Sequence, residues 1–137
     1  MESFYRFNYL SLALALVWNV ALGMFWYSPK VFFKIWQKAE GITDEDMKGS
    51  NPAVAMSANL VTAIVTIWSL AVLANLTGAR GALAGAGLGA LAAIGFVIAS
   101  EVSNAAFRMT KPVVLLIDAG YRLLFLAGSG ALIGGWR

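Results

Sequence analysis

The 137-residue sequence contains neither cysteine nor histidine. The absence of cysteine excludes disulfides, thiolate nucleophiles and thiolate metal ligands. The absence of histidine removes the commonest metal ligand and the side chain that most often acts as a general base. No combination of Ser with Lys, and no pair of carboxylates, has the spacing of a catalytic set. We therefore expect that the protein is not an enzyme and that it holds no metal or other cofactor.

Charged residues are also scarce. Asp, Glu, Lys and Arg make up 12% of the sequence, whereas about a quarter is usual in soluble domains. Hydrophobic residues make up 60% and the mean hydropathy is +0.75, so the composition is that of a membrane protein. The net charge is +3, but the basic residues form no patch with interleaved aromatic residues, so we expect no binding to nucleic acid.

Four apolar runs are long enough to cross a bilayer, which takes about 20 residues in a helix. We predict spans at about 8–27, 53–76, 81–104 and 113–136, within a single transmembrane domain that covers residues 1–137. The first run ends in the bulky residues "MFWY" and not in small residues, so it is an uncleaved helix and not a signal peptide. The predicted fold is an all-α bundle of four transmembrane helices.

A short amphipathic helix is predicted at about 29–39, after the first span. Ser28 and Pro29 form a typical helix start. Lys30, Lys34 and Lys38 then fall on one face, opposite an apolar face that includes Trp36. This pattern is typical of a helix in the membrane surface, and it brings the lysines near anionic headgroups.

The basic residues predict the orientation in the membrane. The loops after the first and third spans hold six of them: Lys30, Lys34, Lys38, Lys48, Arg108 and Lys111. The other side holds three, which are Arg6, Arg80 and Arg137. Because basic residues favour the cytoplasmic side, we expect both termini outside and the amphipathic helix on the cytoplasmic face.

The fourth span contains "LLIDAGYRLL", with Asp118 and Arg122 four residues apart. Residues i and i+4 share a face of an α-helix, so we expect an ion pair between these two side chains. A lone Arg near the bilayer centre costs about 2.5–3.5 kcal/mol on insertion scales, and a partner offsets part of this cost. The pair either fixes the packing of the helices or belongs to a binding site.

Further polar side chains fall in the cytoplasmic half of the predicted bundle. With the pair above they form a candidate binding site: Asn19, Asn59, Glu101, Asn104, Asp118, Tyr121 and Arg122. The outer half of the third and fourth spans is almost entirely Gly, Ala and Leu. We predict a polar pocket open to the cytoplasm, with a formal charge of −1 from Glu101 and Asp118 against Arg122. In the alternative, Glu101 simply ends its helix at the headgroups.

Small residues recur every four positions in the last two spans. They are Gly81, Gly85, Gly89 and Ala93 in the third span, and Gly130 and Gly134 in the fourth. Such stripes allow helices to approach closely. The contact is either between spans of one subunit or between identical subunits.

Two blocks of the sequence are similar to blocks of a known family. They are "GMFWYSPKVFFKIWQKAEGIT", residues 23–43, and "LLIDAGYRLLFLAGSGALIGGW", residues 115–136. Both resemble the bacterial domain-of-unknown-function 1761 family, at Gly23, Trp26, Tyr27, Trp36 and Gly41 and at Ile117, Asp118, Ala119, Gly120 and Tyr121. The resemblance covers nearly the whole chain, the middle only in pattern, and it implies a small four-span inner-membrane protein without an established activity. Arg122 departs from the pattern, in which His follows Tyr.

Two functions fit these patterns. The first is a homo-oligomeric membrane unit for binding or transport, with the polar pocket as its site. The alternative is an accessory or assembly subunit of a larger membrane complex, in which the Asp118–Arg122 pair and the glycine stripes are packing elements. The expected partners are the lipid bilayer and either further copies of the chain or other membrane subunits.

Overall fold

The computed structural model describes residues 8–28, 30–43, 45–46, 49 and 52–135, and these residues form helices and no strand. The helices are α1 (Tyr9–Trp26), α2 (Phe33–Glu40), α4 (Pro52–Thr77), α5 (Ala82–Ala92), η2 (Ala93–Ile98), α6 (Ala99–Arg108) and α7 (Pro112–Gly135). Because α5, η2 and α6 are continuous, four helices are long and apolar enough to cross a membrane. The predicted all-α class with four transmembrane helices is confirmed.

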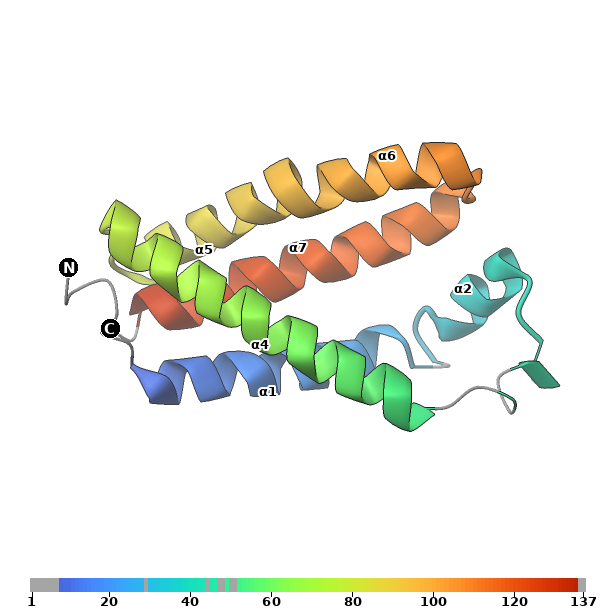
Figure 1. Ribbon diagram of the computed structural model, residues 1–137, viewed down its shortest axis with the longest axis horizontal. Helices are drawn as coiled ribbons and strands as arrows, with labels where there is room; N and C mark the ends of the chain where they lie inside the picture. The colour runs from blue at the N-terminus through green and yellow to red at the C-terminus, as the bar shows by residue number, and fades with distance from the viewer. Residues whose placement is uncertain (1–7, 29, 44, 47–48, 50–51, 136–137) are drawn as a thin grey trace.

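The four long helices alternate in direction (Figure 1). The start of α1, the end of α4, the start of α5 and the end of α7 lie at one end of the molecule, and α2 lies at the other. Helix α7 contacts each of the other helices. Its buried side chains therefore make up much of the core: Val114, Ile117, Tyr121, Phe125, Leu126, Ser129 and Ile133.

Local signals explain where two of the helices begin and end. The side chain of Asn8 caps α1 by accepting a hydrogen bond from the amide of Leu10 at 3.1 Å. Gly41 ends α2 with φ of 74°, a left-handed conformation that glycine adopts without strain. The short amphipathic helix predicted after the first span is thus present, and it starts at Phe33 because the residues before it form a turn.

Helices α5 and α7 approach so closely that their glycines have no room for a side chain. A Cβ on Gly85 would overlap the carbonyl of Gly130, and a Cβ on Gly89 would overlap the carbonyl of Leu126. The amide of Gly81 donates to the carbonyl oxygen of Gly134 at 2.9 Å, between the two helices. The two glycine stripes therefore pack against each other within one chain, which answers the question that the sequence left open.

The π-helix η2 changes which side chains of the third span face α7. Three turns of an α-helix take about 11 residues, so a regular helix would place Ala93 and Asn104 on the same face. A π-helix has more residues per turn, which rotates the rest of the span. As a result, Glu101 lies on the same inner face as the fully buried Ala93, and Asn104 is exposed.

Large apolar side chains cover the outside of the bundle. The most exposed include Leu83, Phe96, Phe107, Met109 and Leu116, which are 72–89% exposed. In water such a surface would be unfavourable. In a bilayer it is the surface that contacts lipid, so the chain is a multi-pass membrane protein.

Candidate functional site

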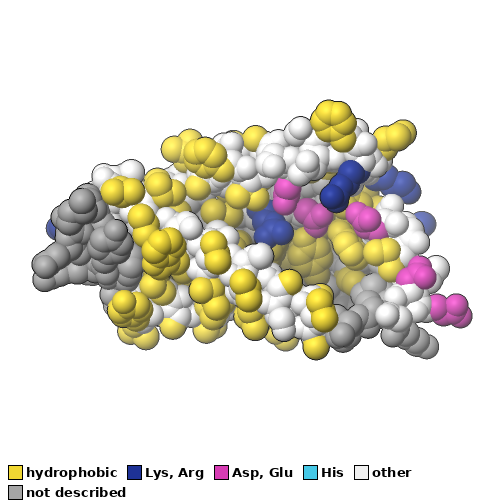
Figure 2. All heavy atoms as spheres, in the orientation of Figure 1, with side chains coloured by type: hydrophobic (Ala, Val, Ile, Leu, Met, Phe, Trp, Pro, Cys, Tyr) yellow, Lys and Arg dark blue, Asp and Glu magenta, His cyan; other side chains and the backbone are white. Residues whose placement is uncertain are grey.

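Polar side chains gather in the half of the bundle where α1 and α6 end and α4 and α7 begin. Figure 2 shows that the charged side chains of one face concentrate in this half. We call this group the polar cluster, and it consists of Asn19, Tyr27, Asn59, Glu101, Asp118, Tyr121 and Arg122. It includes every residue of the predicted binding site except Asn104.

The innermost part of the polar cluster joins three helices by hydrogen bonds. Asn19 of α1 is 1% exposed, and its Nδ2 donates to Oη of Tyr121 on α7 at 2.7 Å. The Tyr121 hydroxyl donates to the backbone oxygen of Asn19 at 3.3 Å. Nδ2 of Asn59 on α4 donates to Oδ1 of Asn19 at 3.2 Å. These buried and partly buried groups satisfy one another, which is the arrangement that the membrane interior requires.

Asp118 is held by Tyr27, the residue that directly follows α1. The Tyr27 hydroxyl donates to Oδ1 of Asp118 at 2.5 Å. Burial, and then the hydrogen bond to this carboxylate, raise the pKa of the Tyr27 phenol far above its usual value near 10. The hydroxyl therefore keeps its proton at neutral pH and acts as a donor to Asp118.

Arg122 forms an ion pair with Glu101 of α6, and this pair lies on the flank of the bundle. Nε of Arg122 is 3.3 Å from Oε1 of Glu101, and the two side chains are 41% and 27% exposed. The guanidinium carbon lies 5.7 Å from the ring centre of Tyr121, within the range of a cation–π contact. Oε2 of Glu101 is buried and has no hydrogen-bond partner among the described residues.

The predicted ion pair between Asp118 and Arg122 is wrong. Both residues have partners on other helices, since Tyr27 donates to Asp118 and Glu101 pairs with Arg122. The prediction rested on the spacing of the two residues within one helix. The rotation by η2 brings Glu101 to the inner face and moves Asn104 to the outside.

Tyr27 was missed because nothing near it in the sequence signals a contact 91 residues away. At the end of an apolar span, a Tyr is typical of the aromatic belt at the membrane surface. In the structure its ring packs edge-on against Tyr121 at 5.5 Å and against Trp36 at 6.2 Å. Trp36, predicted at the membrane surface, is therefore turned toward the bundle, and its indole nitrogen is buried. Lys30, Lys34 and Lys38 are exposed.

The two sequence blocks that carry the family resemblance pack directly against each other. Nε1 of Trp26 donates to the carbonyl oxygen of Ile117 at 2.9 Å, next to the contact between Tyr27 and Asp118. A Cβ on Gly120 would lie 2.9 Å from the ring of Trp26, so only glycine fits closely there. The matching residues of both blocks thus form the contact beside Asp118.

The chemistry of the polar cluster is that of charge and hydrogen bonding. In the described part of the chain, no three Asp or Glu residues lie close enough together to hold a metal ion. Two carboxylates and one guanidinium leave a formal charge of −1. Since the ion pair neutralises Glu101 and Arg122, the excess negative charge belongs to Asp118.

Comparison with known proteins places the chain in a family. No curated protein and no solved structure matches it. The family model described as "Protein of unknown function (DUF1761)" matches residues 10–134. This range includes the whole polar cluster and nearly all of both similar blocks. The chain therefore belongs to this family of proteins of unknown function.

Proposed function

We propose that the protein is a membrane-embedded binding unit that takes a small organic cation, of the ammonium type, at Asp118. The observation that carries this proposal is the charge of Asp118. Tyr27 gives it a hydrogen bond but no positive charge, and Arg122 is paired with Glu101. A carboxylate without an ion pair is costly at membrane depth, and a bound cation would reduce this cost.

The aromatic rings that pack on Tyr27, the hydrogen-bond partner of Asp118, favour an organic cation over a bare metal ion. The rings of Tyr27, Tyr121 and Trp36 form a continuous series, with centres 5.5 Å and 6.2 Å apart. Aromatic faces attract ammonium groups, and desolvation strengthens the attraction. Metal ions of the Mg²⁺ and Ca²⁺ type need several oxygen ligands, and Asp118 supplies a single carboxylate here.

We place the polar cluster on the cytoplasmic side of the bacterial inner membrane, with both termini outside. The support is the distribution of basic residues in the sequence, six in the loops after the first and third spans and three in the other segments outside the spans. The ligand would then enter from the cytoplasm, and binding could be the first step of transport.

We further propose that the unit is a homo-oligomer. The support is the position of the Glu101–Arg122 pair, which is partly exposed on the flank of an apolar bundle. Charged groups at membrane depth almost always face protein or water. A second copy against this flank would cover the pair.

The same exposed pair also supports the alternative function, an accessory subunit of a larger membrane complex. A different membrane protein bound to this flank would cover it equally well. In that case Glu101 and Arg122 fix the position of the partner. The mass of the protein extracted from its own membrane distinguishes the two functions, because only the alternative requires other polypeptides.

Thermal unfolding with added ammonium compounds tests the proposal. Tetramethylammonium chloride and a series of primary alkylammonium chlorides would be compared with sodium chloride at equal ionic strength. We expect at least one compound to raise the Tm by several degrees at concentrations well above its Kd.

Two variants make this test specific. Asp118→Asn should abolish the stabilisation, whereas Glu40→Gln, which removes an exposed carboxylate from the end of α2, should leave it unchanged. If no compound stabilises the wild type, or if Asp118→Asn responds equally, the proposed function is wrong.

A further inference from the structure

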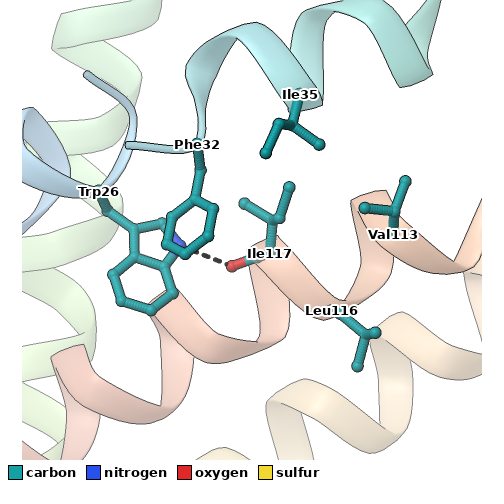
Figure 3. Close-up of a pocket in the computed structure, with 6 residues that line it drawn as sticks. All are labelled: Trp26, Phe32, Ile35, Val113, Leu116 and Ile117. Atoms are coloured by element: carbon teal, nitrogen blue, oxygen red, sulfur yellow. Dashed lines mark hydrogen bonds between the residues drawn. The ribbon is translucent and has the colours of Figure 1, made fainter. Parts of the chain in front are cut away.

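An apolar groove lies between α2 and the first turns of α7, outside the polar cluster (Figure 3). Its volume is about 290 Å³, and its lining residues are Trp26, Phe32, Ile35, Val113, Leu116 and Ile117. None of these residues belongs to the polar cluster. The groove therefore adjoins the proposed cation site at Trp26 and Ile117 but shares no residue with it.

The walls of the groove come from three elements. Val113, Leu116 and Ile117 stand at i, i+3 and i+4 of α7 and share one face. Ile35 points from α2 toward this face, and Trp26 closes one end (Figure 3). The ring of Trp26 is fixed, because its Nε1 donates to the carbonyl of Ile117 and its ring lies 4.7 Å from that of Phe32.

The groove is open toward the surroundings of the bundle. Ile35 is 50% exposed and Leu116 is 72% exposed. The polar atom of the lining side chains, Nε1 of Trp26, already has its hydrogen-bond partner. The groove therefore suits an apolar chain that arrives from the bilayer, and it offers nothing to a polar solute.

Three lysines lie close in the sequence to residues that line the groove. Lys34 precedes Ile35 in α2, Lys38 follows one turn later, and Lys111 lies two residues before Val113; all three lysines are exposed. On α2 the one acidic residue is Glu40, at the last position of the helix. Basic residues at the membrane surface attract anionic headgroups.

We propose that this groove is a specific site for an anionic phospholipid. One acyl chain lies along the apolar walls between α2 and α7, and the phosphate lies among Lys34, Lys38 and Lys111. An uncharged apolar groove would take any lipid chain, so the lysines give the site its preference for an anionic headgroup. The bound lipid would fasten α2 to the bundle.

Native mass spectrometry of the purified protein in a nonionic detergent tests this site. Phosphatidylglycerol and phosphatidylcholine with identical acyl chains would be added in equal amounts. We expect one tightly retained lipid per chain and a clear preference for phosphatidylglycerol. Replacing Lys34, Lys38 and Lys111 together with Gln should reduce this preference by about fivefold for each lysine that contacts the phosphate.

A groove-filling variant separates the acyl-chain site from general lipid adhesion. Ile35→Trp, and Val113→Trp from the opposite wall, should reduce retention of both lipids at least tenfold. Val102→Trp is the matched control, because Val102 is 48% exposed on α6, away from the groove. It should retain lipid like the wild type.

Three results would overturn the proposal. The first is equal retention of the two lipids by the wild type. The second is full retention by both groove-filling variants, and the third is a second copy or a peptide in place of lipid. Each of these results leaves the response of Asp118 to ammonium compounds unaffected, so the two proposals can fail separately.

Discussion

Among the individual residues, Tyr27 connects several parts of the molecule. Its hydroxyl donates to Asp118, its ring packs between Tyr121 and Trp36, and it directly follows α1. It therefore joins the short helix α2 to the polar cluster. The loss of its hydroxyl would leave Asp118 without its donor.

Replacing Tyr27 with Phe should lower the free energy of unfolding by about 1.5–3 kcal/mol, the usual contribution of a hydrogen bond to a charged group. The ring contacts with Trp36 and Tyr121 should remain. Thermal unfolding in detergent at neutral pH measures this change. A Tyr27→Phe protein as stable as the wild type would show that the hydrogen bond to Asp118 contributes nothing.

The same variant should change the response to alkaline pH. The pKa of Tyr27 is raised in the folded protein above its unfolded value near 10, so the folded state binds this proton more tightly. Its contribution to stability is complete below pH 10 and is lost as the pH rises above 10. The wild type should therefore lose more stability than Tyr27→Phe between about pH 9 and pH 11. Equal losses would contradict the raised pKa.

At the scale of the helices, the packing of α5 on α7 depends on glycine at defined positions. A Cβ on Gly89 would overlap the backbone of Leu126, whereas nothing lies within 4 Å of a Cβ on Gly87. Gly87→Ala should stabilise the protein by up to about 1 kcal/mol, because Ala favours the helix. Gly89→Ala should destabilise it by about 1–3 kcal/mol or more.

Thermal unfolding of the two alanine variants, made in parallel, checks this difference. Similar stabilities would mean that the glycine stripes do not face each other within one chain. In that case the stripe of α5 would be free to contact another subunit.

The rotation by the π-helix η2 leads to an equally specific prediction. Deleting Gly95, which has open space around its Cα, should convert η2 to a regular helix and keep Glu101 facing Arg122. Inserting one alanine after Gly95 should rotate α6 by about a further 100° and separate the pair.

The variant with the inserted alanine should therefore be less stable than the variant that lacks Gly95. The expected difference is about 1–3 kcal/mol, the cost of a charged group that loses its partner. Thermal unfolding of the two proteins measures the difference. If the insertion is tolerated as well as the deletion, the rotation by η2 does not position Glu101.

The sequence contained enough information for the helices but not for the pairing of their polar groups. Apolar runs of span length are sufficient to predict α1, α4 and α7, and Asn19 and Asn59 stand out because such runs rarely contain amides. The Asp118–Arg122 pair was predicted from spacing within one helix. The true partners, Tyr27 and Glu101, lie on other elements. No residue of "AIGFVI" signals a π-helix. The rotation that turns Glu101, and not Asn104, toward the inner face could therefore not be predicted from the sequence.

At the scale of the whole molecule, the Glu101–Arg122 pair is the feature that a single chain leaves incomplete. It lies partly exposed on the flank of the bundle. We expect Glu101→Gln to leave Arg122 unpaired and to reduce assembly. The double change Glu101→Leu with Arg122→Leu should preserve the fold, because it removes both charges.

Native mass spectrometry of the protein extracted from its own host membrane would measure this effect. We expect a homo-oligomer for the wild type, which Glu101→Gln dissociates. A wild-type mass that includes unrelated polypeptides would favour the accessory function. A monomer in all variants would contradict the view that a second copy covers this flank.

The central claim is that Asp118 carries the unbalanced charge of the polar cluster and binds an organic cation. Calorimetric titration of the wild type and of Asp118→Asn, with the ammonium compound that stabilises the wild type most, tests it directly. We predict one bound cation per chain in the wild type and an affinity at least tenfold lower in Asp118→Asn, since one ion pair of this kind contributes more than about 1.4 kcal/mol. Equal affinities of the two proteins would contradict the claim.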